Sequence, residues 1–428
     1  MASQRDSDAP VPPGLVLRPF RALRYAADGA ALAALTSPPY DVIDDAERTQ
    51  LLEADPHNVV RLILPEDGAD GTSRYELAAR QLREWQADAT LIRDESPALY
   101  VYEETADGHV QRGLVGGVAL ARADAGIVLP HEDTMAGPVS DRLALSVATQ
   151  ANLEPIFLVY EGGGAASALV AAADQRTPLV DTTTADGVRH RIWAISDAAD
   201  LDAIAADLLG RRATIADGHH RYANYLRYQA DRRAEGAGDG PWDHGLTLLV
   251  DVSVFGPQVH PIHRVIPSLP AAAAAEAAAS TFTVTATAAR GDELLEVLAK
   301  AGAQGPAFGI ADEQSAWLLT EPSAEAAAAA LPADRSAAWR SLDVSLAHHL
   351  LVRRVWGLDD TEDVVGFRHD LASALAAAGT TGTALLLNPT PVEAVAAVAA
   401  AGDRMPRKST LFTPKPRTGL LIRLLDAD

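Results

Sequence analysis

The spacing of hydrophobic and polar positions predicts both strands and helices in the first half of the chain. Short apolar runs are typical of buried strands, and residues 189–195 also alternate between apolar and polar positions. These runs do not alternate regularly with helices, as they would in a doubly wound sheet, so they favour a mixed α/β fold of the α+β class. The predicted strands cover residues 98–103, 114–121, 155–160, 189–195, 213–216 and 246–254.

Helical spacing predicts helices between these strands. Residues 44–54 follow a turn that contains two adjacent prolines, and Asp44 or Asp45 can cap this helix. The positions at helical spacing elsewhere are Leu77, Leu82 and Trp85 in one segment, and Tyr222, Tyr225, Leu226 and Gln229 within residues 220–233.

The character of the sequence changes near residue 267, where alanine becomes frequent and prolines bound the segments. We therefore expect a loose tail at residues 1–13, an α+β core at 14–266 and an Ala-rich α/β unit at 267–428. Within that unit the pattern predicts strands at 282–287, 308–311, 317–320 and 383–387, a helix at 336–355, and surface helices or linkers at 271–279, 324–330 and 394–401.

Composition narrows the classes of function. The formal net charge of -22 over 428 residues disfavours a protein that binds the phosphate backbone of DNA or RNA. The chain has no cysteine, which excludes disulfides, thiolate nucleophiles and cysteine zinc ligands. No segment reads as a signal peptide or a membrane span, so we expect a cytoplasmic protein with no membrane partner.

The densest group of reactive side chains follows the predicted strand that ends at residue 216. Asp217 and Gly218 form the turn, and His219, His220 and Arg221 come at the start of the next helix. Backbone N–H groups and the positive end of the helix dipole would face a ligand over this turn, so an anion site is predicted, with phosphate as the first candidate. The structural alternative is that Asp217 only caps the helix, and that the histidines pack or face solvent.

A second polar group follows the apolar run at residues 126–129. The acids of this group, Glu132 among them, and the imidazole of His131 could act as a general base or hold a divalent metal with phosphate oxygens, and Arg142 follows nearby. Glu132 is the preferred base, because a carboxylate accepts a proton without first losing one. The alternative is a capped helix start in which Asp141 pairs locally with Arg142.

The third group lies at residues 405–415, near the C-terminus. It contains Lys408 and Lys415, two of the three lysines in the chain, together with Ser409 and Thr410. Ammonium and hydroxyl groups are suited to phosphate oxygens or to the carboxylate of a substrate. Prolines and interleaved apolar residues favour an ordered segment over a solvated tail.

The histidines give little support for a zinc site. Pro261 prevents a regular helix between His260 and His263, and the chain contains no HExxH sequence. His263 and Arg264 are better suited to contact an anion or to support the first group. Packing explains the histidine pair within residues 336–355.

Five segments in this order resemble a bacterial and archaeal family catalogued as domain of unknown function one-zero-one-five. The similarity covers nearly the whole chain, but the family name carries no activity. The matching segments are PPYDVI at 38–43, PHEDT at 130–134 followed by DRL at 141–143, ADGHHRY at 216–222, PIHR at 261–264 and MPRKSTLFTPK at 405–415.

The Asp-Gly-His-His-Arg sequence also resembles the signature of the wider ParB and sulfiredoxin-like nucleotide-binding superfamily, which implies that fold for the core. Sulfiredoxin chemistry requires a cysteine, which this chain lacks, and ParB partition proteins bind DNA, which the net charge of -22 disfavours. The free-serine kinases of the superfamily carry an Asp-Gly-His-x-Arg motif and are the closest chemical match.

This resemblance implies transfer of a phosphoryl group from ATP or ADP, with Mg²⁺, to a small hydroxylated metabolite such as serine. Asp217 would position Mg²⁺ or the acceptor, and Glu132 would accept the hydroxyl proton. Two alternatives remain open: a nucleotide-binding regulatory protein of the ParB kind without turnover, and a metal-dependent hydrolase, which is the least favoured. The catalytic candidates are Glu132, Asp217, His219, His220 and Arg221, and the nucleotide or phosphate candidates are Gly218, His131, Arg142, His263, Arg264, Lys408, Ser409, Thr410 and Lys415.

Overall fold

A computed structural model describes residues 10–361 and 363–426, which divide into two compact units. Unit 1 contains the chain up to Pro257 and the segment from Pro414 onward, and unit 2 is Gln258–Thr413. This division differs from the expected second unit at 267–428, because β21 (Arg423–Leu424) pairs with β7 (Ala151–Asn152) of unit 1. The expected tail at 1–13 falls in part on residues 1–9, outside the described residues.

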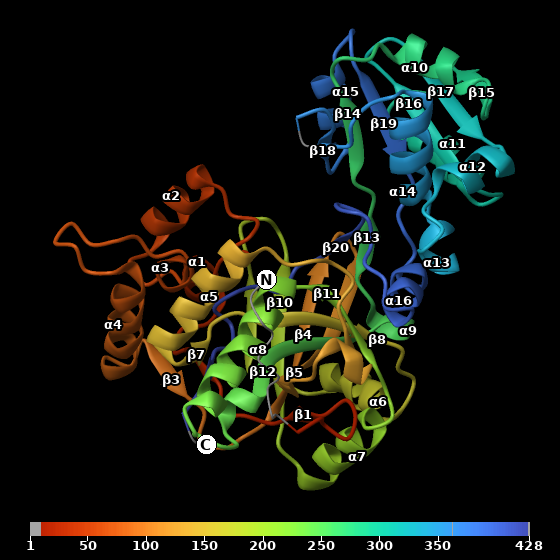
Figure 1. Ribbon diagram of the computed structural model, residues 1–428. Coiled ribbons are helices and arrows are strands. Elements are labelled where there is room, and N and C mark those ends of the chain that lie inside the picture. The colour runs from red at the N-terminus through yellow and green to blue at the C-terminus, as the bar shows by residue number, and fades with distance from the viewer. Residues whose placement is uncertain (1–9, 362, 427–428) are drawn as a thin grey trace. The chain divides into compact units, whose positions relative to one another are not determined.

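Unit 1 is built around a mixed sheet, in which the described residues form nine strands (Figure 1). The pairs β11–β6 and β12–β8 are parallel, and the other pairs are antiparallel. This arrangement confirms the predicted mixed α/β class. The strand order is β6 (Val128–Leu129), β11 (Ala213–Asp217), β8 (Ile156–Tyr160), β12 (His244–Asp251), β5 (His109–Ala119), β4 (Leu99–Ala106), β10 (Arg189–Ile195) and β9 (Val180–Thr183), with β1 (Leu17–Arg18) paired to β5.

Alternate residues of the central strands form the core of unit 1. Ile156 and Leu158 of β8 join a buried cluster with Val170 of α6 (Ala165–Ala172) and Leu208 of α7 (Ala198–Leu208). Burial of one such aliphatic side chain stabilises the fold by about 1.5–3 kcal/mol. This packing fixes β8 and β11 side by side, and the candidate site lies at the end of β11.

The helices of unit 1 confirm the predicted helix over 44–54 and the helix that contains Tyr222. The predicted strand over 246–254 ends at Asp251, because the Asp251 side chain accepts a hydrogen bond from Ser253 N and starts a short helix. Among the described residues, no helix has the length and apolarity needed to cross a membrane. The remaining elements are α1 (Gly29–Leu35), α2 (Asp45–Ala54), α3 (Val60–Ile63), α4 (Arg74–Ala87), α5 (Ala136–Thr149), α8 (His219–Ala234), α9 (Val252–Phe255), and the pair β2 (Leu23–Tyr25) and β3 (Leu91–Arg93).

Unit 2 contains an antiparallel sheet to which the described residues contribute six strands. Its order is β15 (Thr283–Thr287), β17 (Ala316–Thr320), β16 (Ala307–Ala311), β19 (Thr383–Leu387), β14 (His263–Ile266) and β18 (Gly366–Arg368). The other elements are α10 (Ala271–Ala278), α11 (Asp292–Gly302), α12 (Ala324–Ala330), α15 (Leu371–Ala378), α16 (Val392–Ala400), and the pair β13 (Gln258–His260) and β20 (Leu411–Thr413).

The prediction of one continuous helix over 336–355 is wrong. The segment forms α13 (Ala337–Arg340), α14 (Asp343–Leu346) and a π-helical stretch, Ala347–Val355. Leu342 takes an extended backbone conformation with ψ 134, which ends one helix and starts the next. The apolar spacing was compatible with a helix, but spacing alone does not report a backbone break.

Candidate functional site

The turn between β11 and α8 has the conformation that the sequence predicted. β11 ends at Asp217, Gly218 has a left-handed backbone with φ 90, and α8 begins at His219. A Cβ atom on Gly218 would lie 3.1 Å from the Nε atom of Arg221, so both the backbone angle and the available space favour glycine. Because glycine has no side chain to cap α8, no N-cap side chain accepts from the backbone N–H groups at this helix start.

Asp217 binds two cationic side chains. Its Oδ2 atom accepts a hydrogen bond of 2.6 Å from Arg221 Nη2, and its Oδ1 atom lies 2.7 Å from Lys415 Nζ. Arg221 is buried, and its Nη1 atom donates to the carbonyl oxygen of Pro155 at 2.5 Å. The N-cap of α8 is Gly218, so Asp217 forms this ion-pair network and does not cap the helix.

Asp41 joins the same network. Its Oδ2 atom lies 3.4 Å from Lys415 Nζ, so one ammonium group connects two carboxylates. Burial opposes ionisation of Asp41, but Arg221 and Lys415 outweigh it and lower the pKa of this carboxyl. Burial likewise opposes the charge of Lys415, but Asp217 and Asp41 outweigh it and raise the pKa of the ammonium. Asp41 and Lys415 are therefore both charged at neutral pH.

Glu132 lies beside two histidine rings. Its Oε2 atom is 3.7 Å from His219 Nδ1, and its Oε1 atom is 4.0 Å from His131 Nε2. The backbone N–H of His131 donates to His219 Nε2 at 3.2 Å, which leaves the proton of a neutral His219 ring on Nδ1, toward Glu132. The Glu132 side chain is 40% exposed, whereas both histidines are buried. Glu132 is thus the accessible group of this set.

His220 contacts the same loop at its other end. The backbone N–H of Met135 donates to His220 Nε2 at 3.1 Å. Burial lowers the pKa of His220, so the ring is neutral at neutral pH and can accept this bond. His219 and His220 therefore hold residues 131–135, the loop that carries Glu132, against the start of α8.

A buried carboxylate lies beneath this network. Glu154 Oε1 accepts a hydrogen bond from Tyr40 N at 3.0 Å, and Glu154 Oε2 lies 3.8 Å from Arg142 Nη1. Burial raises the pKa of Glu154, although Arg221 and Arg142 act in the opposite direction. The ring of Tyr40 lies under the guanidinium carbon of Arg142 at 4.3 Å. Glu154 and Tyr40 thus lie beside Arg142 and Arg221 in the interior of unit 1.

Arg142 is a predicted phosphate candidate that the structure buries. Its Nη1 atom donates to the carbonyl oxygen of Ile63 at 2.7 Å, and its Nη2 atom pairs with Asp141 Oδ2 at 2.5 Å. The local Asp141–Arg142 pair considered as the alternative is therefore present. Asp41, Tyr40 and Glu154 were not among the predicted site residues, although the PPYDVI segment contains the first two and was a signal for them.

The other predicted candidates lie in unit 2. Arg264 is buried, and its Nη2 atom donates to the carbonyl oxygen of Lys408 at 2.9 Å. Burial lowers the pKa of Arg264 to about 9. His263 is also buried and accepts a hydrogen bond from Leu387 N at 3.3 Å. Within unit 2, Lys408 is exposed, whereas the Ser409 hydroxyl is directed at the carbonyl oxygen of Pro406.

His348 in the π-helical stretch does more than pack. His348 Nε2 accepts a hydrogen bond from Arg264 Nε at 3.1 Å, and His348 Nδ1 lies 2.7 Å from Asp360 Oδ2. Arg407 Nη2 lies 3.0 Å from Asp360 Oδ1. This chain of contacts holds the segment that contains Lys408 within unit 2.

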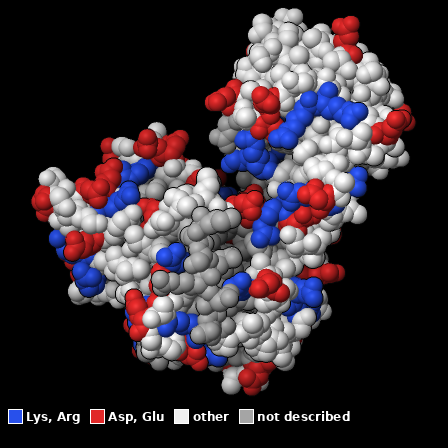
Figure 2. Space-filling model, in the orientation of Figure 1, with Lys and Arg blue, Asp and Glu red and all other residues white. Residues whose placement is uncertain are grey.

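Two further observations bear on the kind of ligand. Among residues 10–361 and 363–426, no group of three or more His, Asp or Glu side chains could hold a metal ion. Acidic and basic side chains are interspersed on the face of unit 1 in Figure 2, so this face offers no continuous basic track for a nucleic-acid backbone.

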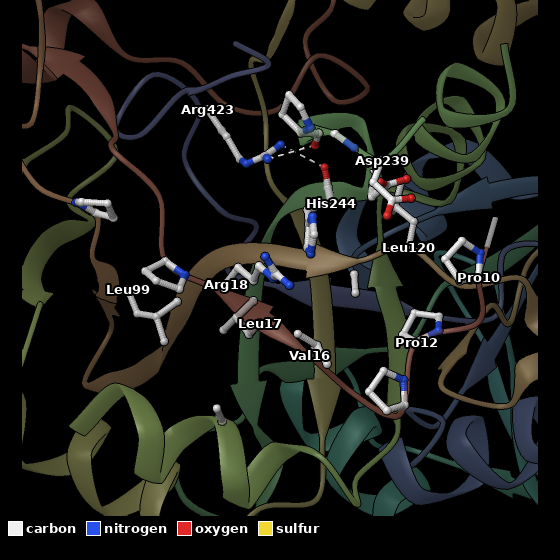
Figure 3. A pocket seen from close by; sticks show the side chains of 18 of the residues that line it. Pro10, Pro12, Val16, Leu17, Arg18, Leu99, Leu120, Asp239, His244 and Arg423 are labelled. Atoms are coloured by element: carbon white, nitrogen blue, oxygen red, sulfur yellow. Dashed lines mark hydrogen bonds between the residues drawn. The ribbon is translucent and has the colours of Figure 1, made fainter. Parts of the chain in front are cut away.

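A large pocket of unit 1 lies away from the residues described above. It has a volume of about 1130 Å³ and is lined largely by proline, leucine and alanine, together with Arg18, His244 and Arg423 (Figure 3). Arg423 donates to the carbonyl oxygens of His244 and Pro241 at 2.9 Å each, so its guanidinium already has acceptors. None of the predicted site residues lines this pocket.

Several solved structures share a weak overall likeness with the chain. SbnI with a C-terminal truncation from Staphylococcus aureus has 10% identity and a TM-score of 0.34, and the match covers 72% of this chain and 87% of the SbnI chain. A free serine kinase in complex with AMP has 12% identity and a TM-score of 0.32, with coverages of 72% and 91%. A conserved hypothetical protein from Pyrococcus furiosus has 13% identity and a TM-score of 0.31, with coverages of 74% and 97%.

The family comparison gives a stronger result. A search of curated proteins finds no match. Residues 17–345, which extend from β1 into unit 2 and include the turn at Gly218, match the sequence profile described as "Protein of unknown function (DUF1015)". The chain therefore belongs to the DUF1015 family.

Proposed function

We propose that the protein binds ATP or ADP at the start of α8 and transfers a phosphoryl group to the hydroxyl of a small metabolite, as a free-serine-type kinase does. The observation that carries this proposal is the junction at Gly218, where an uncapped helix start, Arg221 and the Lys415 ammonium come together. Such a combination is suited to phosphate oxygens. The Asp-Gly-His-His-Arg resemblance and a ParB/sulfiredoxin-like core for unit 1 are part of the same proposal.

Lys415 is the side chain we assign to phosphate binding. It has the geometry of a cation shared between Asp41 and Asp217, with contacts of 3.4 and 2.7 Å. A nucleotide phosphate would compete with these carboxylates for the ammonium. Because the side chain is 17% exposed, little solvent would need to be displaced from it.

Mg²⁺ enters the proposal together with the nucleotide. The ion commonly takes one or two carboxylates and the phosphate oxygens of its substrate. Both oxygens of Asp217 now contact cations, so we propose that Asp217 and Asp41 become its protein ligands when Lys415 pairs with a phosphate. Bound there, Mg²⁺ would neutralise charge on the phosphates.

Glu132 is the base in the proposed reaction. The acceptor hydroxyl oxygen forms a bond to the terminal phosphorus, and the bond from that phosphorus to the bridging oxygen breaks. The hydroxyl proton goes to Glu132, and the nucleotide leaves with one phosphate fewer. His219 and His220, whose Nε2 atoms accept from backbone N–H groups, keep the Glu132 loop at the helix start.

The assay is incubation of the full chain with Mg²⁺, ATP or ADP and a panel of hydroxylated amino acids, with phosphorylated product measured by mass spectrometry. We expect product formation that Asp217→Asn abolishes. Asp231→Asn is the control, because Asp231 lies on α8 outside this ion-pair network and its carboxylate pairs with Arg227 near the surface. Absence of product with every acceptor and both nucleotides would reject the kinase.

One observation favours binding without turnover as a second candidate. Arg221 and Lys415 already neutralise both oxygens of Asp217, so the anionic charge that a metal would require is reduced. A regulatory protein of the ParB kind would bind nucleotide under the same conditions and form no product. Titration calorimetry with ATP and ADP, run beside the assay above, separates the two functions.

A further inference from the structure

Arg417 connects the two segments that bring Lys415 and Asp41 together. Its Nε atom donates to the Thr36 hydroxyl at 3.0 Å, and its Nη2 atom contacts the Thr36 carbonyl oxygen at 3.3 Å. Thr36 lies shortly before Asp41, and Arg417 lies two residues after Lys415. The segments are also paired directly, because Thr418 N donates to Ser37 O at 2.9 Å.

A chain of hydrogen bonds that is closed by one ion pair begins and ends at Arg417. The Arg417 backbone N–H donates to the Tyr102 hydroxyl oxygen at 3.2 Å. The Tyr102 hydroxyl lies 2.8 Å from His190 Nδ1, and His190 Nε2 lies 3.2 Å from the Thr184 hydroxyl. Thr184 donates to Asp186 Oδ1 at 2.5 Å, and Asp186 Oδ2 lies 3.7 Å from Arg417 Nη1. The backbone N–H and the guanidinium of Arg417 are thus held by the same circuit of contacts.

The protons in this circuit have a defined order. Thr184 donates to Asp186, so its hydroxyl oxygen accepts from His190 Nε2, and the other ring nitrogen, Nδ1, accepts from the Tyr102 hydroxyl. Burial lowers the pKa of His190 to about 3, and the neutral ring therefore carries its proton on Nε2 and donates it to Thr184. Burial also raises the pKa of Tyr102, which keeps its hydroxyl protonated. Removal of the Tyr102 hydroxyl would break two successive bonds.

The other side of Lys415 is held as well. Gln111 Nε2 donates to the carbonyl oxygen of Pro414 at 3.1 Å and to Glu104 Oε2 at 2.7 Å. Both Gln111 and Glu104 are buried. The residues directly before and two positions after Lys415 are therefore fixed to β4 and β5, and the lysine lies on a short anchored span.

We propose that Arg417, anchored through its backbone by Tyr102, is a positioning residue that holds the Lys415 ammonium between Asp41 and Asp217. The role of Lys415 in phosphate binding rests on the proposed function. The placement of the ammonium does not, and it can be measured without nucleotide.

Acetylation kinetics test this placement in the full chain. A limiting amount of acetic anhydride is added, and the rates at Lys415 and Lys300 are compared by mass spectrometry. Lys300 is exposed in the last turn of α11 and serves as the internal reference. The variants are Tyr102→Phe and Arg417→Met. Tyr228→Phe is the matched control, because it removes a hydroxyl bonded to Gln150 Oε1 at 2.8 Å, outside the circuit.

We expect the Lys415-to-Lys300 rate ratio to rise about fivefold in each test variant. This factor is the change in the population of the held Lys415 ammonium that follows loss of one hydrogen bond. The ratio should stay at the wild-type value in Tyr228→Phe. An unchanged ratio in both test variants, or an equal rise in the control, overturns the inference. If the ratio rises while the affinities for ATP and ADP are unaltered, the positioning role is supported and the proposed function is contradicted. Failure of the positioning role and failure of the proposed function therefore give different results.

Discussion

The Nζ atom of Lys415 lies 2.7 Å from the Oδ1 atom of Asp217, which joins the C-terminal segment to the turn that precedes α8. Asp41 approaches the same ammonium at 3.4 Å. Three segments that are far apart in the sequence thus meet at one cation. This cation is mostly shielded from solvent, so exchange of its carboxylate partners for a phosphate is the event on which nucleotide binding would depend.

Substitution of Lys415 by methionine should weaken binding of ATP and ADP by tenfold or more. A charge-assisted hydrogen bond contributes about 1.5–3 kcal/mol, and the variant also leaves Asp41 and Asp217 to repel the phosphates. Titration calorimetry measures the dissociation constants. Lys300→Met is the control, because Lys300 lies exposed in unit 2. Equal affinities in the wild type and Lys415→Met would remove this lysine from the site.

Substitution of Gly218 by alanine should lower both stability and nucleotide affinity. Gly236→Ala supplies the comparison, since Gly236 has φ 83 and a Cβ atom there would meet nothing within 4 Å. Both variants should lose about 1–2 kcal/mol of unfolding free energy to the left-handed backbone. Only Gly218→Ala also moves the Arg221 guanidinium, which would lie 3.1–3.3 Å from the new methyl group.

Urea denaturation and nucleotide titration separate these effects. The two alanine variants should lose similar stability, whereas affinity should fall in Gly218→Ala alone. If affinity is retained in Gly218→Ala, the position of the Arg221 guanidinium does not matter for the ligand.

The sequence predicted the strand, turn and helix at Gly218 because all the signals there are local. An apolar run, a glycine and helical spacing act over neighbouring residues, and tertiary packing did not override them. The same reasoning failed at Leu342, where the apolar spacing continues through a break in the helix.

Contacts between distant segments were harder to predict. The approach of Glu132 to His219 and of Lys415 to Asp217 depends on strand pairing and on the return of the chain to unit 1 after Thr413. Asp41 was missed because an acid after Pro-Pro-Tyr reads locally as a turn residue, and only its approach to Lys415 gives it another role. Arg142 had the right chemistry, but Ile63 and Asp141 occupy its guanidinium.

Substitution of Glu132 by glutamine should abolish most turnover and leave nucleotide affinity nearly unchanged. The amide keeps the size of the side chain but cannot accept the hydroxyl proton, and loss of a general base lowers rates by about 10²–10⁴-fold. Product formation and nucleotide titration are measured on the same preparation. Asp133→Asn is the control, because the neighbouring Asp133 is exposed. Equal turnover in Glu132→Gln and the wild type would exclude Glu132 as the base.

Glu104 should make the stability of unit 1 depend on pH. Burial raises the pKa of this carboxyl from 4.5 to about 8, so its contribution is fully present below pH 4.5 and is lost as the pH rises through about 8. Relative to Glu104→Gln, the wild type should therefore lose unfolding free energy on the order of 4 kcal/mol across that interval. Glu235→Gln, at a side chain 62% exposed, should show no such trend. Urea denaturation at pH 5, 6.5 and 8 gives the three comparisons, and parallel stability curves for the wild type and Glu104→Gln would show that Glu104 ionises normally in the fold.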